Sequence, residues 1–520
     1  MNKGIIRVIS VLLFFTFILA GCGGGGSAPA GNTGAATTAA PAGSGKDSIV
    51  VEISSDPPSL HGGFASNIVS AFCSDQIFDK LVTANPDGSF SPSLAKSWEF
   101  TEDGKDIIFE IRDDITFHNG DKMTLEDVVF SYNEIINGTY ADTATSAMVK
   151  AEAVDDSHVK VEFTSVYGPA MTCIATSYMG IFPKAVYEAD PDAFIRKPVG
   201  TGPYKFVSWT SGDSIVLVRN DDYFAGTPPI KNLTLRVFID ASVAAIALEN
   251  GEIDVLTNPM QTDRKTLQNN ANIKYEETES AMTTWGFFNL GEESPFHDQK
   301  LRDAFSYAID REAVMLGAME GAAVPANSSF PSFIPLGNPD YKPKQFDLEK
   351  AQSLMQELGY GPDNHMQLTI AARETPHYYR PLEVIQSQLA EIYVDAVLEK
   401  TEAGAWGENI LRKSDFEFNL LATTMGFYDM DERYELYHSK GGQNFYHMNS
   451  PALDAALDLN RNSSDEETRR QAHHDVIRVL DEETLIIPIY GNMRGIAYNK
   501  DLKGIAPNPG YRYQIKDWSW

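Results

Sequence analysis

A glycine-rich stretch near the middle of the chain, "KPVGTGPYKFVSW", could in principle cradle a phosphate group. A phosphate loop needs backbone N–H groups that converge at the start of a helix, usually followed by Lys and by Ser or Thr. Here Pro203 directly follows Gly202 and removes an N–H group where one is needed. Residues 204–209 then alternate apolar and polar side chains, as a strand does. The pattern therefore disfavours a nucleotide site and leaves Gly200 and Gly202 to be explained in another way.

The histidines are scattered and form no motif of known chemistry. No Gly-x-Ser-x-Gly sequence is present, and His473 and His474 are adjacent rather than spaced for one face of a helix. His438 and His447 could capture a metal, but two histidines nine residues apart are usually unrelated surface groups. We therefore expect no enzyme, no cofactor and no metal site, with metal capture kept as an alternative.

Two cysteines, Cys73 and Cys173, lie within the body of the chain. As a nucleophile, either thiol would need a His partner that the sequence does not locate. Outside the cell the pair could form a disulfide or remain two separately buried thiols. The sequence leaves both alternatives open.

The N-terminus has the features of an export signal. Two basic residues precede an almost continuous apolar run at 9–20, which is short for a membrane span and fits the core of a secretory signal. The run ends in Leu-Ala-Gly-Cys, which resembles a bacterial lipobox, so we expect removal of residues 1–21 and lipidation of Cys22. An ordinary signal cleavage, with Cys22 incidental, is the alternative. Residues 22–46 contain no large apolar side chain and predict a flexible tether to a membrane.

The composition is that of a globular protein and the charge is strongly acidic. With 520 residues, the chain is long enough for two or three domains. A formal charge of -30 argues against nucleic acid and anionic lipid as partners, because both require clustered Lys and Arg. It favours solubility and, more weakly, cationic or zwitterionic ligands.

The first half of the chain interleaves strand and helix patterns. Residues 67–82 place apolar side chains at helical spacing, and residues 98–124 alternate as a hairpin with a turn at Asp103-Gly104. Thr124 precedes Asp127 by three residues, which resembles a capping box at the start of a helix.

The second half is richer in helix signals. We expect helices that begin after Asp298 and after Ser450, and one that ends at Gly359. The apolar run "LIIPIY" close to the C-terminus predicts a buried strand. Such a late strand suggests that the chain returns to its first sheet and that residues 276–479 are inserted as a separate lobe.

Five stretches together resemble the large peptide-type solute-binding proteins of bacterial ABC importers: "FEIRDDITFHNGDKMTLEDVVFSY", "VGTGPYKFVSW", "LENGEIDVL", "PFHDQKLRDAFSYAIDREAV" and "EETLIIPIY". They occur in the order of that family, between residues 49 and 500. The resemblance implies an α/β fold of two lobes, class II in type, that closes around a ligand and carries an extra subdomain on lobe I. It also implies delivery of the ligand to a membrane permease with cytoplasmic ATPases. The expected domains are lobe I (47–75, 186–275 and 480–520), subdomain Ib (76–185) and lobe II (276–479).

The same resemblance explains the glycines. In this family the segment 199–204 is a structural corner that leads into a strand of lobe I. Gly200 and Gly202 are then expected to provide positive φ or a close approach of two backbones, with Pro203 fixing the entry into the strand.

A peptide brings an ammonium, a carboxylate and backbone amides, and a closed cleft must pair both charges. By resemblance, an Asp in the segment "TMGFYDMDERYELYHS" holds the ammonium, so Asp429 and Asp431 are candidates and Phe427 stands where the family carries a Trp. The segment is shorter than in the family and lacks its Pro. Two carboxylates on a solvated loop are the alternative interpretation.

Four further residues are implied by the resemblance, each with a structural alternative. Trp406 falls where relatives carry a cleft-facing Trp, or packs in the core. Arg373 falls where dipeptide receptors hold the ligand carboxylate, or makes a structural salt bridge. Trp285 and Asn289 lie at the crossing into lobe II, where Asn289 would bond a ligand amide or cap a turn.

We therefore expect a lipid-tethered extracytoplasmic receptor of an ABC importer that captures short peptides, held at the membrane through Cys22. Its partners would be the peptide, the permease and its ATPases, and it would act as a monomer without nucleic acid. Two alternatives remain: a receptor for nickel, a metal chelate or another small solute, and a peptide sensor without transport.

Overall fold

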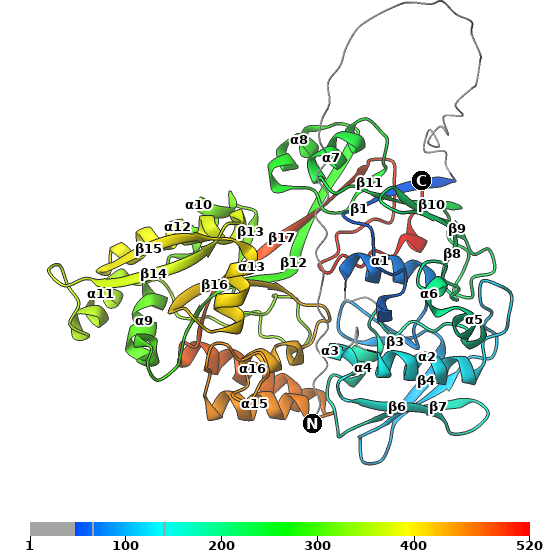
Figure 1. Ribbon diagram of the computed structural model, residues 1–520, viewed down its shortest axis with the longest axis horizontal. Coiled ribbons are helices and arrows are strands. Elements are labelled where there is room, and N and C mark those ends of the chain that lie inside the picture. Colours follow the sequence, from blue (N-terminus) through cyan, green and yellow to red (C-terminus); the bar gives the residue numbers. More distant parts are fainter. Residues whose placement is uncertain (1–46, 65–66, 139–141) are drawn as a thin grey trace, which may run out of the picture. The chain divides into compact units, whose positions relative to one another are not determined.

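The computed structural model describes residues 47–64, 67–138 and 142–520 of the chain (Figure 1). The signal peptide, Cys22 and the tether lie outside the described residues, and these expectations stay predictions. None of the helices in the described ranges is long and apolar enough to cross a membrane.

Nine of the described strands form one large sheet. Within this sheet, β1 and β10 pair in parallel. The pairs β10–β9 and β9–β8 are antiparallel, and β17 pairs with β11 and β12 in antiparallel register. In sheet order the strands are β16 (Phe418–Thr424), β12 (Ile273–Phe288), β17 (Ile486–Asn499), β11 (Val255–Leu256), β1 (Ser48–Ile53), β10 (Asn232–Val237), β9 (Ser214–Arg219) and β8 (Tyr204–Thr210), and β13 (Ala323–Pro325) pairs with β17.

Two long strands connect the two larger hydrophobic cores of the described residues. β12 and β17 pair along most of their length, and Figure 1 shows them running together in green and red between the two halves of the ribbon. A first core gathers apolar side chains from residues 49–255 and 496–518 together with Phe427, and a second core gathers those from residues 281–490. The prediction that the late strand returns to the first sheet is confirmed, because β17 pairs with β11 next to β1. The domain boundaries expected from the sequence stay predictions.

A smaller antiparallel sheet packs into the first core. The hairpin with its turn at Asp103-Gly104 is confirmed: β4 pairs with β5 in antiparallel register, and Gly104 has φ +69°. The capping box is also confirmed, because Thr124 accepts from the Asp127 amide while the Asp127 side chain accepts from the Thr124 amide. The strands in sheet order are β4 (Ala95–Phe100), β5 (Ile107–Ile111), β7 (His158–Phe163) and β6 (Met148–Ala153), with the separate pair β2 (Val82–Ala84) and β3 (Phe90–Pro92).

The helices of the first half are short. The pattern over 67–82 suggested a helix reaching Leu81, but the structure ends α1 at Ile77. The helix stops there because the Ile77 carbonyl accepts the Gly202 N–H, from a distant segment of the chain, at 2.9 Å. The helices are α1 (Ile68–Ile77), α2 (Leu125–Asn137), α3 (Asp142–Thr145), α4 (Ala170–Ile174), α5 (Lys184–Ala189), α6 (Pro191–Phe194), α7 (Ala241–Glu249) and α8 (Arg264–Asn269).

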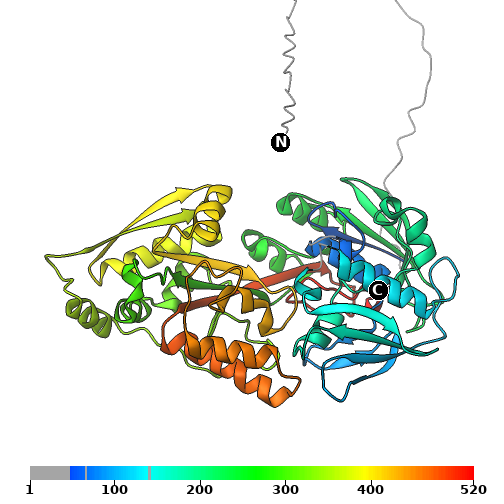
Figure 2. The ribbon, with the colours of Figure 1, turned by 60° about the horizontal axis from the view of Figure 1, so that its bottom comes forward.

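The second core is covered by longer helices with the predicted caps. Asp298 accepts from the Lys300 amide at the start of α9, and Ser450 caps α15 with Pro451 in its first turn. Gly359 follows α11 with φ +89°, as a helix stop requires. Figure 2 shows α15 and α16 in orange, packed side by side. The elements are α9 (Gln299–Ala308), α10 (Arg311–Met319), α11 (Leu348–Glu357), β14 (Met366–Arg373), α12 (Pro376–Ala390), β15 (Val394–Thr401), α13 (Ala403–Trp406), α14 (Tyr434–Tyr437), α15 (Pro451–Arg461) and α16 (Glu466–Glu482).

The two glycines before β8 form a corner packed against the end of α1. A Cβ on Gly200 would lie 2.1 Å from the Ile77 carbonyl oxygen, and one on Gly202 would lie 2.5 Å from the Ile77 carbonyl carbon. Neither glycine has a positive φ. The close backbone approach is therefore confirmed as the reason for both glycines.

The two cysteines are separate thiols. Cys73 and Cys173 are both free and both buried, in α1 and α4. Burial raises the pKa of both the Cys73 and the Cys173 thiol above the usual range. Both therefore behave as small apolar core side chains.

Candidate binding site

Asp429 and Asp431 are buried and already have cationic partners. They are 6 % and 7 % exposed, so the interpretation of a solvated loop is wrong. The Arg469 guanidinium donates to Asp429 Oδ2 at 2.7 Å. Arg461 donates through Nε to Asp431 Oδ1 at 2.6 Å and through Nη2 to Oδ2 at 3.1 Å, a bidentate pair. Each carboxylate is therefore neutralised by an arginine of α15 or α16.

The same two carboxylates join the first half of the chain to the second. The Tyr167 hydroxyl donates to Asp431 Oδ2 at 2.8 Å, and the Gly168 N–H donates to the Arg461 carbonyl at 2.7 Å. The Thr172 hydroxyl, on α4, donates to Asp429 Oδ2 at 3.5 Å. We call this set the interlobe contact: Tyr167, Gly168 and Thr172 on one side, and Asp429, Asp431, Arg461 and Arg469 on the other.

Burial shapes the electrostatics of the interlobe contact. Desolvation raises the pKa of the Asp431 carboxyl, and Arg461 opposes that effect. Desolvation also raises the pKa of the Tyr167 hydroxyl, so this group stays protonated and donates. Phe427, which is 4 % exposed, packs into the first core from the same segment as the aspartates. The segment is therefore held in place by both halves of the molecule.

Arg433 is a buried cation without a carboxylate partner. It is 5 % exposed, and no carboxylate of the described residues lies within 4.0 Å of it. Its Nη2 donates only weakly, to the Thr423 carbonyl at 3.5 Å, and its Nε has no partner. The guanidinium lies over the Trp285 ring, 5.3 Å from the ring centre. The charge of Arg433 opposes the rise that burial causes in the pKa of the Glu432 carboxyl, without an ion pair between the two groups, so Arg433 Nε stays a buried donor without an acceptor among the described residues.

Arg373 and Trp406 come together beside a third ring. The Arg373 guanidinium lies 5.1 Å from the centre of the Tyr378 ring and 5.9 Å from that of Trp406. Within the described part of the chain Arg373 makes no ion pair, and its Nε has no partner. Trp406 is 2 % exposed and its Nε1 has no acceptor. The structural salt bridge considered for Arg373 is therefore absent among these residues.

The two arginines are linked through adjacent residues of β16. The Tyr378 hydroxyl, next to Arg373, donates to the Ala422 carbonyl at 2.9 Å, and Arg433 donates to the neighbouring Thr423 carbonyl. Arg373 and Arg433 therefore lie in one region of the second core, and aromatic rings pack beside both guanidinium groups. The sequence gives no signal for Arg433, because it is a single Arg in a polar run; its burial in the structure is what distinguishes it.

Trp285 and Asn289 are engaged inside the protein. Trp285 is fully buried, and its Nε1 donates to the Tyr446 hydroxyl at 3.3 Å. The Asn289 amide donates to the Phe416 carbonyl at 3.0 Å, and its oxygen accepts from the Gly291 amide at 3.0 Å. This geometry favours the turn-capping interpretation of Asn289.

The histidines considered for metal capture have separate partners. His447 Nδ1 lies 2.9 Å from the Asn289 oxygen, and His438 Nε2 lies 3.5 Å from Asp458 Oδ1. Among the residues that the structure describes, no group of three or more His, Cys, Asp and Glu side chains could hold a metal ion.

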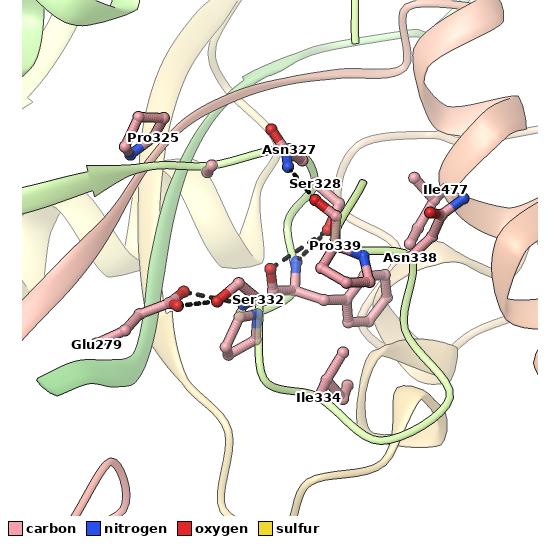
Figure 3. Close-up of a pocket in the computed structure, with 12 residues that line it drawn as sticks. Glu279, Pro325, Asn327, Ser328, Ser332, Ile334, Asn338, Pro339 and Ile477 are labelled. Carbon is pink, nitrogen blue, oxygen red and sulfur yellow. Dashed lines mark hydrogen bonds between the residues drawn. The ribbon is translucent and has the colours of Figure 1, made fainter. Parts of the chain in front are cut away.

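A small pocket opens beside β12, between the segment 325–339 and α16 (Figure 3). The Glu279 carboxylate accepts from the Ser332 amide at 2.9 Å at its edge, as Figure 3 shows. Its cavity volume is about 10 Å³, room for about one water molecule. This pocket therefore does not hold a peptide, and the arginines above remain the better candidate.

Comparison with known proteins shows the family to which the chain belongs. Residues 89–445 match the family of bacterial extracellular solute-binding proteins, family 5 (middle region). The chain is 24% identical over 476 residues to heme-binding protein A of Haemophilus influenzae, covering 84% of this chain and 86% of that protein. It is 24% identical over 554 residues to the oligopeptide-binding protein AppA of Bacillus subtilis, covering 99% of each.

A solved structure shows the same fold. The ABC transporter substrate-binding protein CtaP of Listeria monocytogenes superposes with a TM-score of 0.81 at 24% identity, covering 91% of this chain and 99% of that one. The fold is therefore the two-lobed α/β fold of substrate-binding proteins, as the sequence predicted. The chain belongs to family 5 of the bacterial extracellular solute-binding proteins.

Proposed function

We propose that the protein is the substrate-binding lipoprotein of an ABC importer and that it captures short peptides between its two lobes. Membership of family 5 supports the receptor role, and relatives such as the oligopeptide-binding protein AppA support peptide as the ligand. The proposal includes binding without catalysis, a lipid anchor at Cys22 on the extracytoplasmic face of the cell membrane, and delivery to a permease by a monomer.

The observation that carries the proposal is the pair of arginines without counter-ions. Arg433 and Arg373 lie beside aromatic rings, and neither has a carboxylate within ion-pair distance among the described residues. A peptide carboxylate would supply the missing charge through charge-assisted hydrogen bonds. Trp406 and Trp285 would shield the bound peptide from water and cover its apolar side chains.

The ammonium role of Asp429 and Asp431, with Phe427 beside them, stays a prediction. An ammonium at these carboxylates would have to share them with Arg469 and Arg461. The role of Asn289 in holding a ligand amide also stays a prediction, since its amide already serves the turn.

Mass spectrometry of the ligand that co-purifies with the full chain tests the proposal. We expect masses of short peptides, released when the protein is unfolded. A porphyrin or a metal chelate released in a one-to-one ratio would overturn peptide as the ligand and favour another solute of the same family.

Calorimetry tests the arginine directly. Arg433→Met should weaken peptide binding by about 2–5 kcal/mol, because the ligand charge loses its buried partner. Arg470→Met is the matched control, since the Arg470 side chain on α16 is 37% exposed and, among the described residues, pairs with its neighbours Glu466 and Glu467. Equal peptide affinity of the Arg433→Met variant and the wild type would remove Arg433 from the site.

A further inference from the structure

The carboxylate oxygens of the interlobe contact are all in use. Asp429 accepts from the Asp431 amide on Oδ1 and from Arg469 and Thr172 on Oδ2. Asp431 accepts from Arg461 on Oδ1, and from Arg461 and Tyr167 on Oδ2. The two carboxylates therefore face two guanidiniums, of which Arg461 also pairs with the exposed Glu435 carboxylate at 3.3 Å.

A ligand ammonium could reach these oxygens only by displacing a guanidinium. Arg469 is nearly buried, with a side chain 11% exposed, and its displacement would leave an unpaired cation in the protein. Removing one partner of a buried ion pair costs more than the pair itself contributes. The interlobe contact is thus complete without a ligand.

Glu432 is the remaining carboxylate of this segment. Its two oxygens accept from the Gly426 amide at 2.7 Å and from the Phe427 amide at 3.0 Å. Burial raises the pKa of its carboxyl, against the opposing charge of Arg433. Both oxygens therefore hold the loop together, and Glu432 is a poor partner for an added cation.

Two arginines of the region lack an ion pair. Arg433 and Arg373 have no carboxylate within ion-pair distance in the described part of the chain, while Asp429 and Asp431 each have an arginine. A ligand carboxylate could therefore pair with Arg433 or Arg373 without displacing another carboxylate.

We infer that this receptor recognises the carboxylate end of its ligand and does not require an ammonium. Asp429 and Asp431 serve the interlobe contact, and Arg433 with Arg373 receives the anion. This inference rests on the proposed function, and it extends the accepted ligands from free peptides to acylated peptides that carry only a carboxylate.

Calorimetry on the purified full chain tests the inference without any mutation. The probes are Ala-Leu, Ala-Leu-Ala and Ala-Leu-Ala-Leu, each in the free, the N-acetylated and the C-amidated form. We expect N-acetylation to change the dissociation constant by less than about fivefold, and C-amidation to raise it by at least about 30-fold.

The outcomes separate the inference from the function on which it rests. If the free peptides bind and N-acetylation weakens them by about 30-fold or more, the inference is wrong while peptide capture stands. If none of the nine compounds binds, peptide capture is wrong and the inference falls with it. The variant Asp429→Asn gives a second test. We expect this substitution to weaken binding of the free tripeptide by no more than it weakens binding of the N-acetylated tripeptide.

Discussion

The hydroxyl of Tyr167 offers a sharp test of the interlobe contact. Tyr167→Phe removes one buried hydrogen bond of 2.8 Å to a charged acceptor and leaves the ring in place. Such bonds contribute about 1.5–3 kcal/mol. Because Asp431 keeps both bonds to Arg461, we expect the lower end, about 1.5 kcal/mol. That value corresponds to about a tenfold shift from the formed to the broken contact.

The Gly168 amide reports on this contact directly. Its N–H donates across the contact to the Arg461 carbonyl at 2.7 Å, so its hydrogen exchange follows the opening of the contact. In the ligand-free protein, Tyr167→Phe should speed exchange of the Gly168 amide by about tenfold.

A matched variant separates the contact from general destabilisation. The Tyr341 hydroxyl donates to Asp481 Oδ2 at 3.0 Å, and both residues lie in the half that contains the second core. Tyr341→Phe should lower the free energy of unfolding by a similar amount and leave exchange at Gly168 unchanged. If Tyr167→Phe also leaves that exchange unchanged, the contact contributes nothing and the reasoning is refuted.

Two further changes test the fold. Gly202→Ala places a Cβ 2.5 Å from the Ile77 carbonyl carbon and should lower the free energy of unfolding in urea by about 3 kcal/mol; a loss below about 0.5 kcal/mol would contradict the close backbone approach at this corner. Burial lowers the pKa of His473 from 6.5 to about 3, so the folded ring stays neutral while the unfolded ring takes up a proton below its ordinary pKa. Its contribution to stability is complete above pH 6.5 and is lost as the pH falls towards 3, by about 1.4 kcal/mol per unit. His473→Leu should therefore reduce the slope of unfolding free energy against pH by about one proton between pH 4.5 and 6, and an unchanged slope would count against a neutral buried ring.

Features decided by near neighbours were predictable from the sequence. The caps at Asp298 and Ser450 and the capping box at Thr124 depend on residues at most three positions away. The end of α1 was not predictable, because the Gly202 N–H that takes up the Ile77 carbonyl comes from far along the chain. Local pattern thus gives the elements, and contacts between distant segments decide where they stop.

The candidate site was likewise predictable only in part from the sequence. The resemblance located the segment of Asp429 and Asp431, but their partners Arg461 and Arg469 come from helices that follow 30 and 40 positions later. An aspartate recognised by its position in a family motif carries no information on whether its charge is free. Only the paired geometry shows that the carboxylates are satisfied and that the nearby Arg433 is not.

The net charge of the chain misleads for a related physical reason. A formal charge of -30 suggested cationic or zwitterionic ligands, yet the unpaired charges of the candidate site are arginines. Exposed carboxylates act on a ligand through water and salt, which screen them within about 10 Å. Arg433, which is 5 % exposed, acts in a medium of much lower dielectric constant and at contact distance. Under the proposed function, a buried group such as Arg433 therefore acts more strongly on a bound ligand than the surface carboxylates do.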